Sequence, residues 1–115
     1  MANTFKQISK AGVTSADVIY TVAGSTTTVV LGLIIGNTQS SDITVTLTIE
    51  TDTANRSGAN NEANQNVELL TSTTIPANSS LEIMQGNKIV LETTDVVKLT
   101  ASAAADISIS VMEIT

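Results

Sequence analysis

Carboxylates are the side chains of this sequence that could do acid–base chemistry, because the chain contains no histidine and no cysteine. Glu50 and Asp52 stand at i and i+2 around the end of a predicted strand, so their side chains are expected on the same side. A glycosidase, however, needs two carboxylates that face each other across a cleft. Sugar-binding clefts are also lined with aromatic rings, and this chain has one Tyr, one Phe and no Trp. The sequence therefore predicts a protein that is not an enzyme.

A metal site is the second chemistry to consider, because carboxylate and amide oxygens are the ligands of Ca²⁺. In the segment 52–66, six such side chains are the candidate ligands, namely Asp52, Asn55, Asn60, Asn61, Glu62 and Asn64. Their spacing matches no EF-hand loop, and two of the six carry charge. A zinc site built on His or Cys is excluded. We expect no metal and no cofactor.

The charge balance argues against nucleic acid and the apolar pattern argues against a membrane. Eleven acidic and five basic residues give a net charge of −6, and five scattered cations form no basic stripe that could neutralise phosphates. The longest apolar stretch, 29–35, is interrupted by Gly32 and is far shorter than the ~20 residues of a spanning helix. No apolar run of signal-peptide length follows the first residues. We expect a soluble protein that is made inside the cell.

The elements that must position these side chains are β-strands. The segment Ile43–Glu50 alternates apolar and polar residues over eight positions, which is typical of a strand with one buried face. The apolar run 29–35 predicts a strand buried on both faces, and 37–42 predicts a hairpin loop that leads to the next strand. Further strand patterns occur at 4–9, 17–22, 67–73, 80–84, 88–92, 96–101 and 107–111.

Seven to nine short strands without helical periodicity predict an all-β fold, an antiparallel β-sandwich of jelly-roll type. We expect one domain over residues 13–115, with an N-terminal arm at 1–12 and an exposed loop at 52–66 that lacks large apolar residues. Near the end, Met112 and Ile114 are apolar after the alternation of 107–111, and this change of phase predicts a bulge.

The surface composition points to a partner. Charged residues make up 14% of the chain, against ~25% in a typical soluble domain, and the predicted outer faces carry Thr and Ser. A β-protein with few lysines on its edges risks edge-to-edge pairing unless a partner covers part of its surface. We expect burial in an assembly, with partner contacts at Phe5, Lys6, Val30, Ile34, Arg56, Asn60 and Asn61.

Most of the chain outside 52–66 resembles a family of known proteins. The likeness lies in the opening Met1-Ala2-Asn3-Thr4-Phe5-Lys6, in Val18-Ile19-Tyr20-Thr21-Val22 with Thr26-Thr27-Thr28-Val29-Val30-Leu31-Gly32-Leu33, in Asn37-Thr38 before the 43–49 strand, and in Ile75-Pro76-Ala77-Asn78-Ser79-Ser80-Leu81-Glu82-Ile83 with Lys88-Ile89-Val90-Leu91, Asp95 and Glu113-Ile114-Thr115. These segments are similar to small virion structural proteins of tailed bacteriophages, notably those that infect cyanobacteria and other marine bacteria.

The resemblance implies a non-enzymatic β-sandwich that assembles on a virion in the host cytoplasm. Its implied role is capsid decoration (cement), in which the protein binds the major capsid protein shell and stabilises it. A neck, tail or fibre-associated position in the same particle is the alternative. By analogy with other decoration proteins the chain would be a homo-oligomer, for example a trimer. A carbohydrate-binding module is an alternative of another class. The presence of no more than two aromatic residues in the chain argues against it.

Overall fold

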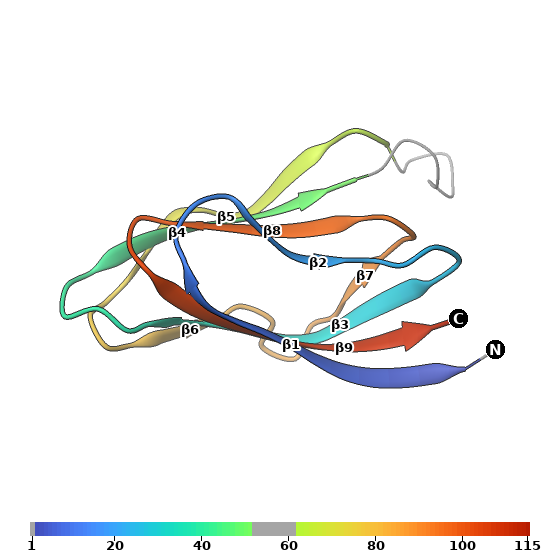
Figure 1. Ribbon diagram of the computed structural model, residues 1–115, viewed down its shortest axis with the longest axis horizontal. Helices are drawn as coiled ribbons and strands as arrows, with labels where there is room; N and C mark the ends of the chain where they lie inside the picture. The colour runs from blue at the N-terminus through green and yellow to red at the C-terminus, as the bar shows by residue number, and fades with distance from the viewer. Residues whose placement is uncertain (1, 52–61) are drawn as a thin grey trace.

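The computed structural model describes residues 2–51 and 62–115, which form two antiparallel β-sheets that face each other (Figure 1). The five-stranded sheet contains β1 (Asn3–Val13), β9 (Ala105–Ile114), β3 (Thr27–Asn37), β6 (Ser80–Glu82) and β7 (Ile89–Leu91). The four-stranded sheet contains β2 (Asp17–Thr21), β8 (Val96–Ala101), β4 (Ile43–Glu50) and β5 (Asn66–Ile75). The predicted all-β, antiparallel sandwich is confirmed. No helix that could span a membrane occurs among the described residues.

The strand order is that of a jelly roll. The larger sheet runs β1-β9-β3-β6, with β7 also paired to β3, and the smaller runs β2-β8-β4-β5. Consecutive strands therefore lie in opposite sheets, except for the pairs β4–β5 and β6–β7. The two short strands β6 and β7 share one position on the far edge of β3. Because every sheet combines strands from distant parts of the sequence, both sheets depend on long-range pairing.

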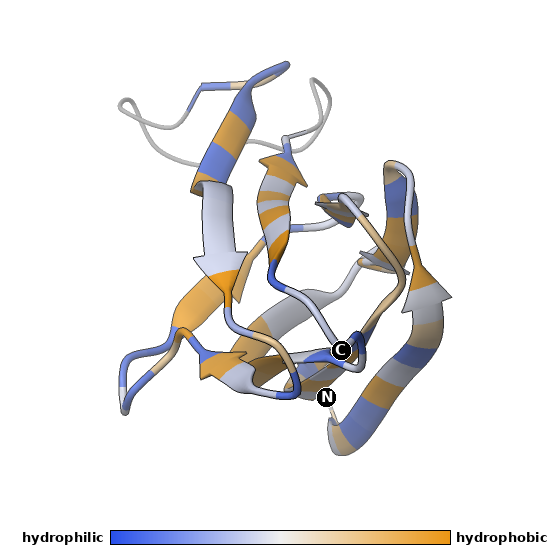
Figure 2. Cartoon of the chain, turned by 90° about the vertical axis from the view of Figure 1, so that its left-hand side faces the viewer, coloured by the Kyte–Doolittle hydropathy of each residue, from blue (hydrophilic) through white to orange (hydrophobic). Residues whose placement is uncertain are grey.

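The core lies between the sheets and follows the alternation of the sequence. In β4, Ile43, Val45 and Leu47 are buried between the sheets while the threonines between them face outward. Figure 2 shows the same alternation as hydrophobic and hydrophilic bands along the strands. A side-chain period of two puts each apolar set on one face, so the prediction for Ile43–Glu50 is confirmed.

The connection between β3 and β4 is not the expected hairpin, because these strands lie in opposite sheets. Asn37, which is 3% exposed, turns the corner. Its Nδ2 donates to the carbonyl oxygens of Ser41, Ile75 and Pro76 at 2.9, 3.0 and 3.1 Å, and its Oδ1 accepts from the backbone N–H of Gln39 at 2.8 Å. One amide side chain thereby satisfies backbone groups that the crossing would leave unpaired.

Strand β3 is buried on one face rather than on two. Val30, Leu33 and Ile35 point into the core, whereas Ile34 is 44% exposed on the opposite face. The register against β9 shifts between Val30 and Gly32, which leaves Leu31 as an extra residue in β3. This extra residue changes the alternation by one position, so that Leu33 and Ile35 point inward like Val30. A continuous apolar run gives no phase, which is why the sequence could not reveal the open face.

The end of β9 also differs from the expectation, because it contains no bulge. Its register with β1 is unbroken from Ile107 to Ile114. Met112 faces outward and Glu113 faces the core, where it is buried. The inward and outward positions therefore continue to alternate, but here an apolar residue, Met112, faces outward and a charged residue, Glu113, faces inward.

The N-terminal segment 1–12, expected as an arm, forms most of strand β1, which pairs with β9 of the same chain. The chain ends also pair, through hydrogen bonds between the backbones of Ala2 and Thr115, and lie side by side in Figure 1. The backbone of β9 supplies the hydrogen-bonding partner that a free arm would lack. Of the predicted loop 52–66, residues 52–61 lie outside the described part of the chain, and Asn66 already belongs to β5.

Candidate interaction surface

The acid–base groups inside the sandwich form a closed network that joins both sheets. The Tyr20 hydroxyl, from β2, donates to Glu113 Oε2, from β9, at 2.5 Å, and lies 2.8 Å from Thr28 Oγ1 of β3. Because the single phenolic proton goes to Glu113, the Thr28 hydroxyl is the donor to Tyr20. Lys6 Nζ of β1 lies 2.9 Å from Glu113 Oε1. Each polar atom of this cluster thus has a partner.

The electrostatics of the network keep the phenol protonated and the carboxylate ionised. Burial, followed by the hydrogen bond to Glu113, raises the pKa of Tyr20 to about 12. The hydrogen bonds from Tyr20 and from Lys6 lower the pKa of Glu113 below its usual value. Neither group is close to changing its charge near neutral pH, so the arrangement holds the sheets together and is not suited to proton transfer.

Of the other described carboxylates, Asp95 is buried (3% exposed) and accepts the backbone N–H of Glu92 at 3.0 Å, while Glu50 and Asp42 have partners at the surface. Glu50, the first half of the pair considered for catalysis, lies 2.7 Å from Lys98 Nζ on the outer face of the four-stranded sheet. Asp42 Oδ1 accepts the backbone N–H of Ala77 at 3.1 Å. Asp52, the second half of the pair, lies outside the described residues.

The calcium hypothesis rested mainly on residues that the structure does not describe, namely Asp52, Asn55, Asn60 and Asn61. Within 2–51 and 62–115, no group of three or more carboxylates is arranged to hold a metal ion.

The outer faces of the two sheets differ in chemistry. On the four-stranded sheet, the outward positions of β4 and β8 carry threonines, Val96, Glu50 and Lys98, and Val18 of β2, opposite Lys98, is 48% exposed. On the five-stranded sheet, four apolar side chains lie opposite one another across β1, β9, β3 and β7, and we call them the apolar row: Phe5, Met112, Val29 and Val90. Phe5 is 71% exposed and Val90 is 61% exposed. The apolar row is an uncharged band across one face of the sandwich.

An open hollow of about 530 Å³ lies toward the other end of the same face. Ser9, Ile34, Gly36, Asp106 and Ser108 are among its lining residues. They come from the three longest strands of this sheet, β1, β3 and β9, and small side chains leave the backbone accessible there. The face thus combines a protruding apolar band with a depression.

The structure brings together two of the seven predicted contacts. Phe5 and Ile34 are both exposed on this face. Lys6 points inward to Glu113 instead, although half of its side chain remains accessible. Val30 is wrong as a contact residue, because it is 3% exposed and packs in the core. The last three residues, Arg56, Asn60 and Asn61, lie outside the described part of the chain.

Sequence reasoning missed Met112, Val29 and Val90 as surface residues. A signal for Met112 was present, because an uninterrupted alternation through 107–114 places it outward and Glu113 inward. The apolar Met112 and Ile114 were instead interpreted as a bulge, which did not place Met112 on the surface. Val90 lies in a three-residue strand that is too short to show a period.

The fold and this face define a jelly-roll domain with an exposed apolar band on its five-stranded sheet. No protein-family model matches the chain, and no curated protein sequence matches it. Two solved structures are similar in fold. One is a chain of the disulfide-linked pili that form Bacillus endospore appendages, with 16% identity, 99% of this chain and 87% of that chain covered, and a TM-score of 0.49. The other belongs to the infectious bursal disease virus Gx strain, with 10% identity, 96% and 36% covered, and a TM-score of 0.47. At these scores neither likeness bears on function.

Proposed function

We propose that the chain is a non-enzymatic structural component of a tailed-bacteriophage virion, a decoration (cement) protein that binds the major capsid protein shell and stabilises it. The observation that carries the proposal is the apolar row, an uncharged band on one face of a chain with a net charge of −6. Exposed apolar patches of this kind mark association surfaces. The resemblance of the sequence to small phage virion proteins is the reason for proposing that the assembly is a phage particle.

The physics of a decorated shell suits such a surface. A protein that binds the assembled shell, and not its dissociated subunits, stabilises the shell by mass action. Many identical copies on a symmetric particle convert modest single contacts into strong overall binding. An exposed apolar surface on a rigid sandwich therefore suits a protein that works in an assembly, and a neck, tail or fibre position in the same particle would use it in the same way.

Catalysis and sugar binding have less support among the described residues. Glu113 and Tyr20 are held by each other and by their neighbours, which leaves neither group available to a substrate. Tyr20 also cannot offer a stacking face together with Phe5, because its hydroxyl end points into the sandwich while Phe5 lies on the outer face. A carbohydrate-binding module would have to rely on Phe5 alone.

The test uses particles produced from the genome that encodes this chain. We expect the protein in purified virions by mass spectrometry, and its density on the outer shell in a reconstruction of the particle. Particles from a deletion mutant should lose their DNA at a lower temperature, and addition of the purified protein should restore the original value. Density on the tail would move the protein to the alternative position. Absence from virions, while the protein is present in the lysate, would refute the proposal.

A further inference from the structure

The edges of both sheets are poorly suited to strand addition, which directs association to a face. On β1, Lys6 and Lys10 occupy the positions opposite Val111 and Ile107, whose side chains point into the core. Pairing of another sheet along this edge would bury both ammonium groups, a common protection of edge strands. The other long edge strand, β5, shifts register twice against β4 and has a positive φ of 44° at Ser72. Such bulges interrupt the row of backbone groups that an added strand would need.

Two glycines in β3 leave space on the outer face of the five-stranded sheet. A Cβ placed on Gly32 would meet nothing within 4 Å, and one on Gly36 would meet only the Asp106 carbonyl oxygen at 3.9 Å. Neither glycine has a positive φ. Internal packing and backbone conformation would therefore accept alanine, although glycine weakens a strand interior. Gly32 lies at the bulge of β3 against β9, where glycine is common, whereas at Gly36 a molecule on the outer face would meet no side chain.

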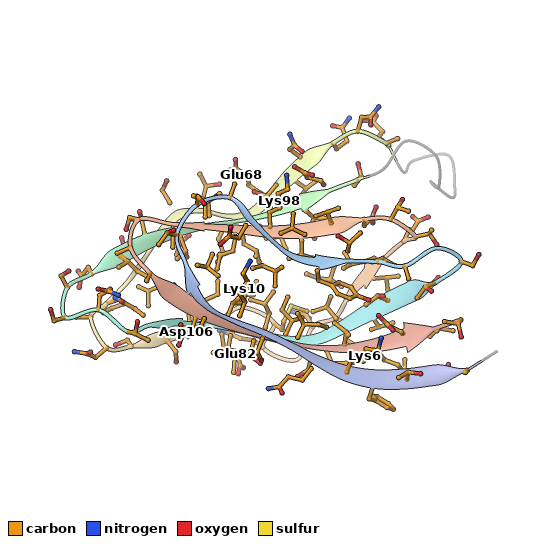
Figure 3. The ribbon with its side chains drawn as sticks, in the orientation of Figure 1. Lys6, Lys10, Glu68, Glu82, Lys98 and Asp106 are labelled. Carbon is orange, nitrogen blue, oxygen red and sulfur yellow. The ribbon has the colours of Figure 1, made fainter. Side chains whose placement is uncertain are left out.

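Two carboxylates of the face lie at the end with the hollow, whose lining also includes Lys10. In register, Asp106 lies opposite Gly36 and Glu82 lies opposite Ile34, and Figure 3 shows both carboxylates at the same end of the five-stranded sheet. The apolar row crosses the other end and contains no ionisable group. Phe5 and Ser9 are four residues apart on β1, which separates the row from the hollow by ~13 Å.

This asymmetry selects one arrangement of two copies. A two-fold axis across the strands, through Gln7, Ser110 and Gly32, would lay the Phe5 ring of each copy over the hollow of the other. The carboxylates of each copy would then face the uncharged end of its partner. An axis along the strands would instead bring Asp106 and Glu82 of both copies together, which a chain of net charge −6 disfavours.

The area suits a weak but specific contact. Three long strands of about ten residues present a face of roughly 14 by 34 Å, or ~500 Å² in projection. Standard interfaces bury about 800 Å² per partner, so this face falls in the size range of weak, transient contacts. Repeated contacts on a symmetric particle would strengthen the binding.

We infer that the outer face of the five-stranded sheet binds a second copy of this chain, with the Phe5 ring of each copy seated in the hollow of the other. This inference rests on the proposed function and assigns the apolar row to the contact between two copies, so that the dimer is the unit that decorates the shell and the capsid protein meets other surfaces of that dimer. It can be tested on the purified chain alone, so its failure is distinguishable from failure of the virion role.

The experiment is sedimentation equilibrium of the full chain between ~1 μM and ~1 mM, a range that reaches the weak contacts expected of this area. We expect a monomer–dimer equilibrium. Phe5→Ser, at an exposed position, should raise the dissociation constant at least tenfold. Gly32→Val should do the same while leaving Tm unchanged or higher. The matched control for Phe5→Ser is Val18→Ser, which replaces an exposed apolar residue (48%) on the four-stranded sheet. It should leave the dissociation constant unchanged.

A cross-link distinguishes the two axes, because the natural chain has no cysteine. A bismaleimide that spans ~12 Å, slightly more than the spacing of stacked sheets, should join Asn3→Cys to Ala11→Cys in a mixture, and neither variant to itself. A chain that stays monomeric to ~1 mM, or a Phe5→Ser or Gly32→Val variant that dimerises like the natural protein, would overturn the inference. Self-linking of either cysteine variant would overturn the arrangement.

Discussion

Ionisation of Tyr20 should report the internal network directly, because it is the single tyrosine in a chain without tryptophan. The phenolate absorbance near 295 nm therefore has one source. In the folded protein the pKa is raised to about 12 from an ordinary value of 10.0, mainly by burial and then by the hydrogen bond to Glu113. We expect little phenolate between pH 10 and 11 as long as circular dichroism shows the native sheets. In denaturant the same side chain should titrate near 10.

The magnitude follows from the linkage between ionisation and folding. A folded-state pKa above the unfolded value gives stability that is fully present below pH 10 and is lost as the pH rises toward 12. At 1.36 kcal/mol per pKa unit, the contribution of Tyr20 is ~2 kcal/mol after allowance for the partial exposure of its ring. The free energy of unfolding, measured by urea titration at each pH, should fall by about this amount across the interval.

The perturbation is Glu113→Gln, which removes the negative charge beside the phenol. The pKa of Tyr20 should fall below that of the natural protein yet stay above 10, because burial is the largest cause and remains. At pH 7 we expect a loss of ~2 kcal/mol, typical of a hydrogen bond to a charged group. The matched control Glu82→Gln removes the same charge from β6 and should change neither quantity, since Glu82 pairs with the far end of β3.

Acid should erase the difference between the natural protein and Glu113→Gln. A folded-state pKa below the ordinary 4.5 gives stability that is present above pH 4.5 and is lost as the pH falls through the folded value. The two unfolding free energies should therefore converge at low pH. If Tyr20 of the folded natural protein titrates near 10, or Glu113→Gln leaves its pKa unchanged, the assignment of the network is wrong.

Three further predictions concern stability, measured by urea unfolding at pH 7. Leu47→Ala removes a fully buried side chain between the sheets and should cost about 3 kcal/mol, so a loss below ~1 would contradict its place in the core. Asn37→Ala deletes donors to three carbonyls and should cost about 3 kcal/mol; Asn37→Asp, which keeps the acceptor for Gln39, should recover only part, and full recovery would argue against the donor role. Lys98→Met breaks a partly exposed ion pair with Glu50 and should change stability by less than ~1 kcal/mol, with a larger loss pointing to a buried pair.

The parts of the fold that could be predicted are those where apolar and polar residues alternate along the sequence. In Ile43–Glu50 the side-chain period alone separates the core face from the outer face, because a strand has only two faces. The same holds for 107–111, where Ile107, Ile109 and Val111 are buried. Strand number and the antiparallel sandwich follow from many short segments of this kind.

The candidate surface could be predicted only in part. Phe5 and Ile34 are apolar residues that a composition argument can single out, and both are exposed on one face. Val30 was a wrong choice because the phase of an all-apolar strand depends on a shift of register against β9, which no local pattern contains.

Chain composition and alternation alone were enough to establish a β-protein, the buried positions of its alternating strands and the absence of histidine and cysteine chemistry. Folding in three dimensions decided that Glu113 turns inward, since its partner Tyr20 is 93 residues away in the chain. It also decided that Phe5, Met112, Val29 and Val90 form one band, because pairing across four strands brought them into register. Side-chain periodicity is a property of neighbouring residues, whereas register and sheet-to-sheet contact arise only when distant segments meet.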